Sequence, residues 1–174
     1  MKELNVSLIG NSNYMQVDLL QSINHILESN TLLAMSSLTG SQSYINTAYF
    51  SYNCKLELFI LTEHSTIHAQ NIEKNSSVAA AIWMDSGIYG ENLQGIQLFG
   101  TCEKVSAFKM IDALNNYNTR FPTFAQIIKH PTDFAKGLVK SRLYVIKIEK
   151  IKLIDEPKFG RRNYISLSIK KEHE

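Results

Sequence analysis

Over residues 31–62 the apolar residues of this chain recur at every second position, whereas in the N-terminal region they recur at every third or fourth. The runs with the two-residue period are separated by short polar turns, such as Gly40-Ser41 and Tyr52-Asn53. Short turns join antiparallel strands, because a parallel connection needs a crossover of about a dozen residues or more. The pattern therefore predicts an antiparallel sheet preceded by one helix.

The predicted elements follow the order helix, three strands, short helix, two strands, helices and a long strand. Six or so strands with helices at the margins fit a small barrel of the α+β class, mostly β. The first half contains an N-terminal helix over about 14–29 capped by Ser12 or Asn13, strands within 31–62, a helix over about 66–74 and a strand at 78–83. A strand at 95–105 follows, and then a helix that has Ser106 as its cap and Phe108, Ile111, Leu114 and Tyr117 as its apolar stripe. The last elements are a short helix with Phe124, Ile127 and Ile128 on its inner side and a strand over 142–154.

Two irregularities are expected within the strands. Gly100 lies in the middle of the strand 95–105, which indicates a bulge or a close approach of another backbone. In the last strand the alternation slips between Ile148 and Ile151, which predicts a bulge near Glu149-Lys150.

Composition narrows the class of protein. The 174 residues predict a single domain, 1–174, with the barrel over about 31–155 and a C-terminal extension over 156–174. A net charge of +2 gives no basic face for nucleic acid, and no apolar run approaches the roughly 18 residues that span a bilayer. The start lacks the pattern of a signal peptide, and two cysteines make no disulfide framework. The expected compartment is the cytoplasm.

The segment 61–72 holds the best candidate site, because it passes from a strand end into a helix start. The hydroxyls of Thr62, Ser65 and Thr66 meet free helical N–H groups there, and the helix dipole favours an anion such as phosphate. His68, one turn into the helix, could add positive charge. The alternative is that Ser65 or Thr66 only caps the helix.

The spacing of Thr62, Thr66 and His68, followed by Asn71-Ile72, resembles that of the FMN-binding split-barrel family, the pyridoxamine 5'-phosphate oxidase-like proteins. The resemblance is closer to the bacterial YhbP-like branch in the segments 59–63, 68–70, 95–97, 117–122 and 159–162. It implies a six-stranded antiparallel split β-barrel with flanking helices that forms a homodimer. It also implies FMN as the cofactor, with its phosphate on Thr62, Ser65, Thr66 and His68.

In that family the flavin ring lies between two subunits, which implies contacts with the backbone around Asn46 and Thr47, with Leu61 and Thr62, and with Gln97 from a later strand. The sequence departs from the family at three expected cations, since His68 stands in place of a lysine, Asn46 in place of an arginine, and Ile67 at a position that is often basic. Arg161 and Arg162, or Arg120, could compensate, also across a dimer interface. The alternative for Arg161 and Arg162 is a solvated loop.

Three functions remain open from the sequence. One is an FMN-dependent oxidoreductase of unknown substrate and electron donor, in which the flavin performs the chemistry and no catalytic residue is named. The second is a non-catalytic binding protein for FMN, heme or another cofactor, and the third is a cofactor-free dimer. Tyr44, Tyr49 and Arg120 are candidate substrate contacts, and Trp83 is expected in the core. His64 and His68 lack an evident third ligand, so no metal site is predicted.

Overall fold

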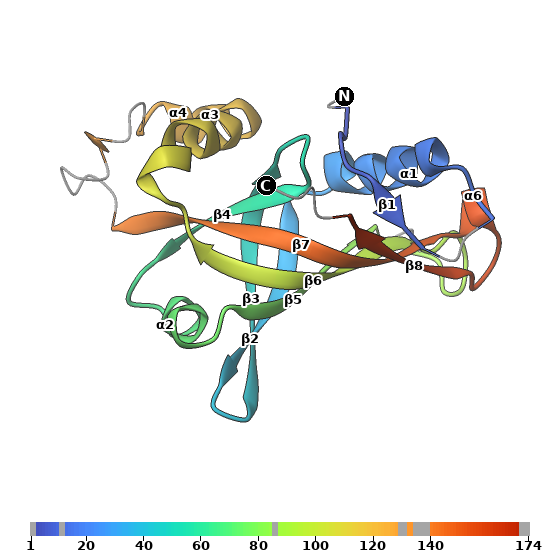
Figure 1. The fold of residues 1–174 in the computed structure, drawn as a ribbon, viewed down its shortest axis with the longest axis horizontal. Coiled ribbons are helices and arrows are strands. Elements are labelled where there is room, and N and C mark those ends of the chain that lie inside the picture. The colour runs from blue at the N-terminus through green and yellow to red at the C-terminus, as the bar shows by residue number, and fades with distance from the viewer. Residues whose placement is uncertain (1–2, 11–12, 85–86, 129–131, 134–139, 171–174) are drawn as a thin grey trace.

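Six antiparallel strands close into a barrel (Figure 1). The computed structural model describes residues 3–10, 13–84, 87–128, 132–133 and 140–170. The pairing runs β7-β4-β3-β2-β5-β6 and returns from β6 to β7, so the predicted six-stranded split barrel with flanking helices is confirmed. The barrel strands are β2 (Leu32–Thr39), β3 (Gln42–Tyr52), β4 (Glu57–Glu63), β5 (Ser77–Met84), β6 (Gln94–Lys104) and β7 (Ser141–Asp155).

One edge of β7 is shared by two strands. Its residues 141–147 pair with β4, and its residues 150–154 pair with β8 (Tyr164–Ile169), whose outer edge carries β1 (Leu8–Ile9). The C-terminal extension over 156–174 thus contains a strand, β8, that the sequence analysis did not predict. Ile165 and Leu167 alternate with exposed or half-exposed residues and are buried, so β8 extends the inner face of the barrel.

The bulge between β6 and β7 lies where the sequence predicted it. Phe99 pairs with Lys150 and Gly100 pairs with Ile148, which leaves Glu149 as the extra residue. Gly100 is also the expected close approach, because a Cβ atom there would lie 2.0 Å from the carbonyl oxygen of Lys147. The extra residue resets the alternation, so Ile148 before it and Ile151 after it both face inward.

Helices α1 (Gln16–Ser29) and α2 (Ile67–Lys74) lie on opposite sides of the barrel strands and contribute to the main core (Figure 1). Complete burial of each large aliphatic side chain contributes roughly 1.5–3 kcal/mol. The start of α1 differs from the prediction, because Met15 occupies the N-cap position and no side chain caps it. Asn13 is therefore not the cap, and Ser12 lies outside the described residues. The core combines Leu19, Ile23, Ile26 and Leu27 of α1 with Ala69 and Ile72 of α2 and with Leu33, Met35, Phe50 and Tyr52 of the barrel, among others.

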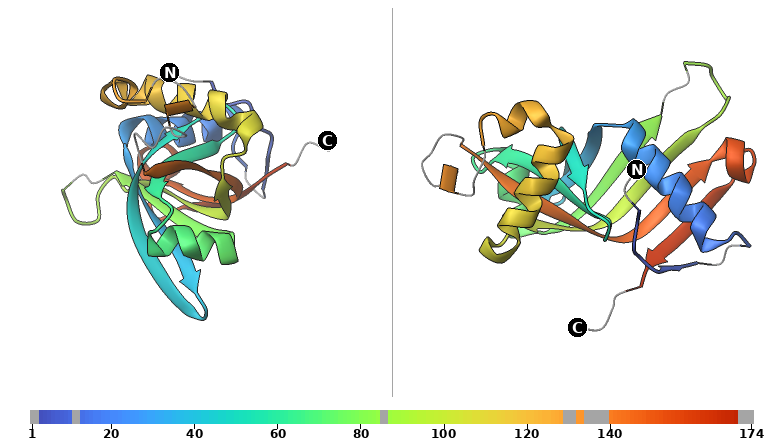
Figure 2. Two further views of the ribbon diagram at one scale, coloured as in Figure 1. Left: turned by 90° about the vertical axis from the view of Figure 1, so that its left-hand side faces the viewer. Right: turned by 90° about the horizontal axis from the view of Figure 1, so that it is seen from above.

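A second apolar cluster fixes α3 (Met110–Arg120) and α4 (Pro122–Ala125) against the outer face of β4 and β7 (Figure 2). Leu114 and Tyr117 are buried there as predicted. Phe108 is 94% exposed, because it belongs to a 3-10 turn (Ala107–Lys109) before the helix and so lies off the helical stripe. Ile111 and Ile127 are also exposed, and Ser106 makes no side-chain cap, so these three expectations were wrong.

Arg120 joins α3 to α1. Its guanidinium donates to the carbonyl oxygens of Leu27 and Asn30 at the end of α1, and it stacks on the rings of Phe50 and Tyr52 at 4.8 and 5.3 Å. The guanidinium thus satisfies carbonyls that a helix end leaves without partners. Arg120 therefore links α3 to the end of α1 by hydrogen bonds. This structural role differs from the expected role as a phosphate or substrate contact.

Candidate functional site

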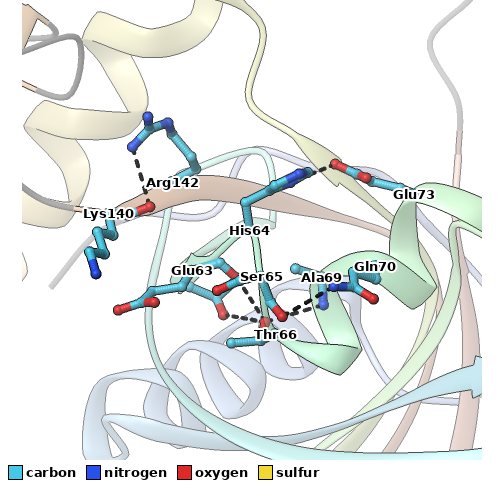
Figure 3. Close-up of polar contacts among 10 residues, drawn as sticks. Glu63, His64, Ser65, Thr66, Ala69, Gln70, Glu73, Lys140 and Arg142 are labelled. Atoms are coloured by element: carbon cyan, nitrogen blue, oxygen red, sulfur yellow. Dashed lines mark hydrogen bonds and ion pairs between the residues drawn. The ribbon is translucent and has the colours of Figure 1, made fainter. Parts of the chain in front are cut away.

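The connection from β4 to α2 is built around Thr66. Its hydroxyl donates to the carbonyl oxygen of Glu63 at 2.7 Å and accepts from the N–H of Ala69 at 3.4 Å, so Thr66 is the N-cap (Figure 3). Ser65 is exposed beside it, and its carbonyl oxygen accepts from the side-chain amide of Gln70. Thr66 therefore caps α2.

Thr62, Thr66 and His68 form one polar cluster at this helix start. The Nε2 atom of His68 lies 2.6 Å from the hydroxyl of Thr62 and 3.1 Å from that of Thr66. The two hydroxyls are 3.3 Å apart. Burial lowers the pKa of His68, so its imidazole is neutral at pH 7. The cluster is a set of neutral hydrogen-bonding groups beside the partial positive charge of the helix N-terminus.

Two buried polar groups on the same barrel face have no partner among the described residues. One is the side-chain amide of Asn46, in which neither the nitrogen nor the oxygen has a partner, and the other is the hydroxyl of Tyr144. Phe50 pairs with Ile60 and Ile60 with Tyr144, so the alternation of the strands places Asn46, Thr62 and Tyr144 on the inner face. An unpartnered buried polar group is costly, about 1–3 kcal/mol, so these groups suit a polar ligand that reaches the cluster.

Arg142 is a cation that the sequence analysis missed. It lies directly opposite Thr62 in the β4–β7 ladder, and its guanidinium donates to the carbonyl oxygens of Lys140 and Ser141 (Figure 3). Burial raises the pKa of Tyr144, and the positive charge of Arg142 partly offsets this effect. The only sequence signal was a basic residue at the start of the last strand.

The remaining predicted contacts lie elsewhere. Thr47 and Gln97 are on the outer barrel face, where Ala34 pairs with both Thr47 and Ala81, and Ala81 pairs with Gln97. The side chain of Leu61 packs against the α3–α4 cluster, away from the polar cluster of Thr62, Thr66 and His68. The outer face holds an apolar hollow of about 300 Å³ lined by Ala34, Ser36, Ile45, Ala79, Ala80, Ala81, Gln97 and Phe99.

Trp83 lies at the border of the same outer face and is not a core residue. It is 36% exposed, and a Cβ atom on Gly95 would lie 2.4 Å from its indole ring. Gly95 therefore leaves the space that the ring occupies. The expectation of a core tryptophan was wrong because the ring lies on an outward position of β5.

Arg161 and Arg162 follow α6 (Glu156–Phe159), which lies at the end of the molecule away from α2 (Figure 1). The Arg161 guanidinium donates to the carbonyl oxygen of Gly90 at 3.4 Å, and the backbone N–H of Arg162 donates to Glu156. Both side chains are exposed. The fold therefore does not bring these arginines to Thr62, Thr66 and His68 of the same chain.

Other reactive groups add nothing to this site. Burial raises the pKa of the Cys102 thiol to about 12, which keeps it protonated, and Cys54 is exposed. His64 pairs with Glu73 at 3.1 Å. Within the described ranges, no three histidine, cysteine or acidic side chains gather as metal ligands. None of the helices in the described part of the chain combines the length and the apolar character needed to cross a membrane.

The fold and the site define a split-barrel protein of the architecture used by flavin-binding and heme-binding proteins. No protein-family model and no curated protein sequence matches the chain. Among solved structures it is similar to a heme-binding protein from Mycobacterium smegmatis (TM-score 0.66, 11% identity, 85% of this chain and 56% of that chain). It is also similar to a FAD-binding protein from Mesorhizobium loti (TM-score 0.58, 11% identity, 85% and 96% of the two chains).

A candidate pyridoxamine 5'-phosphate oxidase from Listeria innocua has the same fold, with a TM-score of 0.56 and 13% identity over 77% of this chain and 96% of that chain. The chain spans 56% of the length of the Mycobacterium smegmatis protein and 63% of a similar protein from Agrobacterium tumefaciens. Identities this low establish the shared fold.

Proposed function

We propose that this chain is a cofactor-binding protein that takes FMN and acts as a homodimer. The observation that carries the proposal is the convergence of Thr62, Thr66 and His68 within 2.6–3.3 Å at the start of α2. Hydroxyls, an imidazole and first-turn N–H groups are the donors that a phosphate accepts from. When bound, FMN supplies the redox chemistry, and the protein supplies its position and electrostatics.

The residues present fit a phosphate through neutral donors. Thr62 and His68 face each other, and Asn46 and Tyr144 offer unpartnered polar atoms on the same inner face. Arg142 brings a positive charge to the strand position opposite Thr62. The outer hollow around Ile45 and Phe99 offers an apolar surface for a flat ring system. An oxidoreductase role belongs to the same proposal, with substrate and electron donor undefined.

The neutral character of the cluster favours a second candidate, a heme-binding or other cofactor-binding protein without turnover. The imidazole of His68 is neutral, which is the form that ligates metals and also the form that attracts a phosphate dianion least. A structural relative is a heme-binding protein, so hemin is the relevant competitor of FMN in an experiment.

The experiment is a titration of the purified chain with FMN, riboflavin and hemin, followed by absorbance after dialysis. We expect retained FMN and weaker binding of riboflavin, which has the same ring without the phosphate. Thr62→Val removes one hydroxyl at constant shape and should weaken FMN binding about tenfold. His68→Lys places a fixed charge at the cluster and should tighten FMN binding, while riboflavin binding stays unchanged.

Thr119→Val is the matched control, since this hydroxyl is exposed on α3 and donates to the carbonyl oxygen of Asn115. Equal affinity of FMN and riboflavin in every variant would show that the phosphate does not bind at Thr62, Thr66 and His68. Retention of hemin alone would establish the second candidate, and retention of neither would leave the cofactor-free dimer.

A further inference from the structure

The outer surface of β6, β7 and β8 presents hydrogen-bond donors and cations without a neighbouring acid in the same rows. The strand register places six side chains in two rows across these strands. The rows are Phe99, Lys150 and Ser168, and Gln97, Lys152 and Ser166. A groove of about 450 Å³ runs along them and also touches Ile9 of β1. We call it the lysine groove.

The β7 bulge is what turns both lysines outward. Ile148 faces the core, so Lys150 would also face the core if the strand alternated without interruption. The extra residue Glu149 shifts the alternation by one, and Lys150 and Lys152 then share the outer face. The ammonium of Lys152 lies 4.7 Å from the centroid of the Tyr164 ring, an aromatic contact on the neighbouring strand β8.

Three lysines of the described residues have an acidic partner, which Lys150 and Lys152 lack. Lys109 pairs with Glu57 at 2.8 Å, Lys147 with Glu103 at 2.5 Å, and Lys158 with Asp18 at 3.3 Å. No ion pair joins Lys150 or Lys152 to a carboxylate within the described part of the chain. The Cα atoms of the two lysines are therefore roughly 7 Å apart along the strand, and neither side chain forms an ion pair with a carboxylate of the described residues.

We propose that the lysine groove is a second ligand site, one that binds a small organic anion. The oxyanion group lies between Lys150 and Lys152 and accepts from Ser166 or Ser168, while the apolar part of the ligand rests on Phe99, which is 42% exposed. Charge-assisted hydrogen bonds are the stronger class, which suits a site on an open surface. The groove does not include Thr62, Thr66 or His68, which lie on the inner face, and it shares Phe99 with the neighbouring outer hollow.

The test uses two fluorescent probes with the same aromatic body, anilinonaphthalene sulfonate, which carries an anion, and phenylnaphthylamine, which does not. Each is titrated into the full chain at low salt. The double variant Lys150→Gln/Lys152→Gln should bind the sulfonate at least about tenfold more weakly and the neutral probe unchanged. High salt should weaken the sulfonate alone.

Lys104→Gln is the control, because this exposed lysine on β6 lies outside the groove and its loss changes the net charge in the same direction. It should leave both probes unaffected. The proposal is overturned if the double variant binds the sulfonate as the wild-type chain does, or if it loses both probes to the same extent.

Discussion

His68 is a titratable residue of the polar cluster whose pKa the fold lowers. In water an imidazole titrates near pH 6.5, but burial beside Thr62 and Thr66 disfavours its charged form. The folded chain therefore binds this proton less readily than the unfolded chain does. By linkage, the contribution of His68 to stability is fully present above about pH 6.5 and is lost as the pH falls below it.

The first prediction follows from that sign. Between about pH 7.5 and pH 5, the Tm of the wild-type chain should fall more than the Tm of His68→Gln, whose side chain keeps hydrogen-bonding atoms but does not titrate. His25→Gln is the matched control, since it removes an exposed histidine of α1. Scanning calorimetry at several pH values measures the difference, and parallel curves for wild type and His68→Gln would contradict the argument.

Among the elements, the long strand β7 depends on its bulge, and the bulge depends on Gly100. A methyl group at this position would meet the Lys147 carbonyl oxygen at 2.0 Å, and backbone cannot yield as a flexible side chain does. Gly100→Ala should therefore lower the free energy of unfolding by about 2–4 kcal/mol. Denaturant titration provides the measurement.

Gly40→Ala serves as the comparison for Gly100→Ala. Gly40 has a φ of +59° in the β2–β3 turn but open space around it, so its replacement should cost about 1–2 kcal/mol through backbone conformation alone. If Gly100→Ala lowers the free energy of unfolding no more than Gly40→Ala does, then β6 and β7 can move apart at this position without loss of stability, which would contradict the prediction.

The periodicity of the sequence was enough to predict the barrel strands, the bulge and the cap by Thr66, because each depends on neighbours along the chain. It missed β8, although Ile165 and Leu167 alternate as strand residues do. It could not have predicted β1, whose two residues pair only because β8 offers an edge. The sequence also could not show which predicted cofactor contacts face inward and which face outward. The strand register decides this, and it places Asn46 on the inner face and Thr47 on the outer face.

At the scale of the whole molecule, the outer face of β4 and β7 is covered by α3 and α4, and α3 also contacts β3, whereas the outer face around Ala34, Ile45 and Ala81 holds the apolar hollow. Large apolar side chains remain exposed there, including Ile45 at 70% and Tyr49 at 57%. A patch of this kind marks an interaction surface. We expect it to be the contact surface of the proposed homodimer.

The third prediction tests this surface. Ile45→Asp would bury a carboxylate in the interface, so the dimer should dissociate at least about a hundredfold more readily. Ile111→Asp is the control, because Ile111 is 60% exposed on α3, away from that face. Sedimentation equilibrium distinguishes the forms, and an Ile45→Asp chain with unchanged mass would place the interface elsewhere.

The position of β7 in the chain also determines when the barrel can form during synthesis. The two strands that it joins, β4 and β6, end at residues 63 and 104, whereas β7 begins at residue 141. Until that strand leaves the ribosome, both edges remain unpaired and can template pairing with another nascent chain. Closure is thus a late, long-range event, and a chain cut short before residue 141 would carry two open edges in place of a ring.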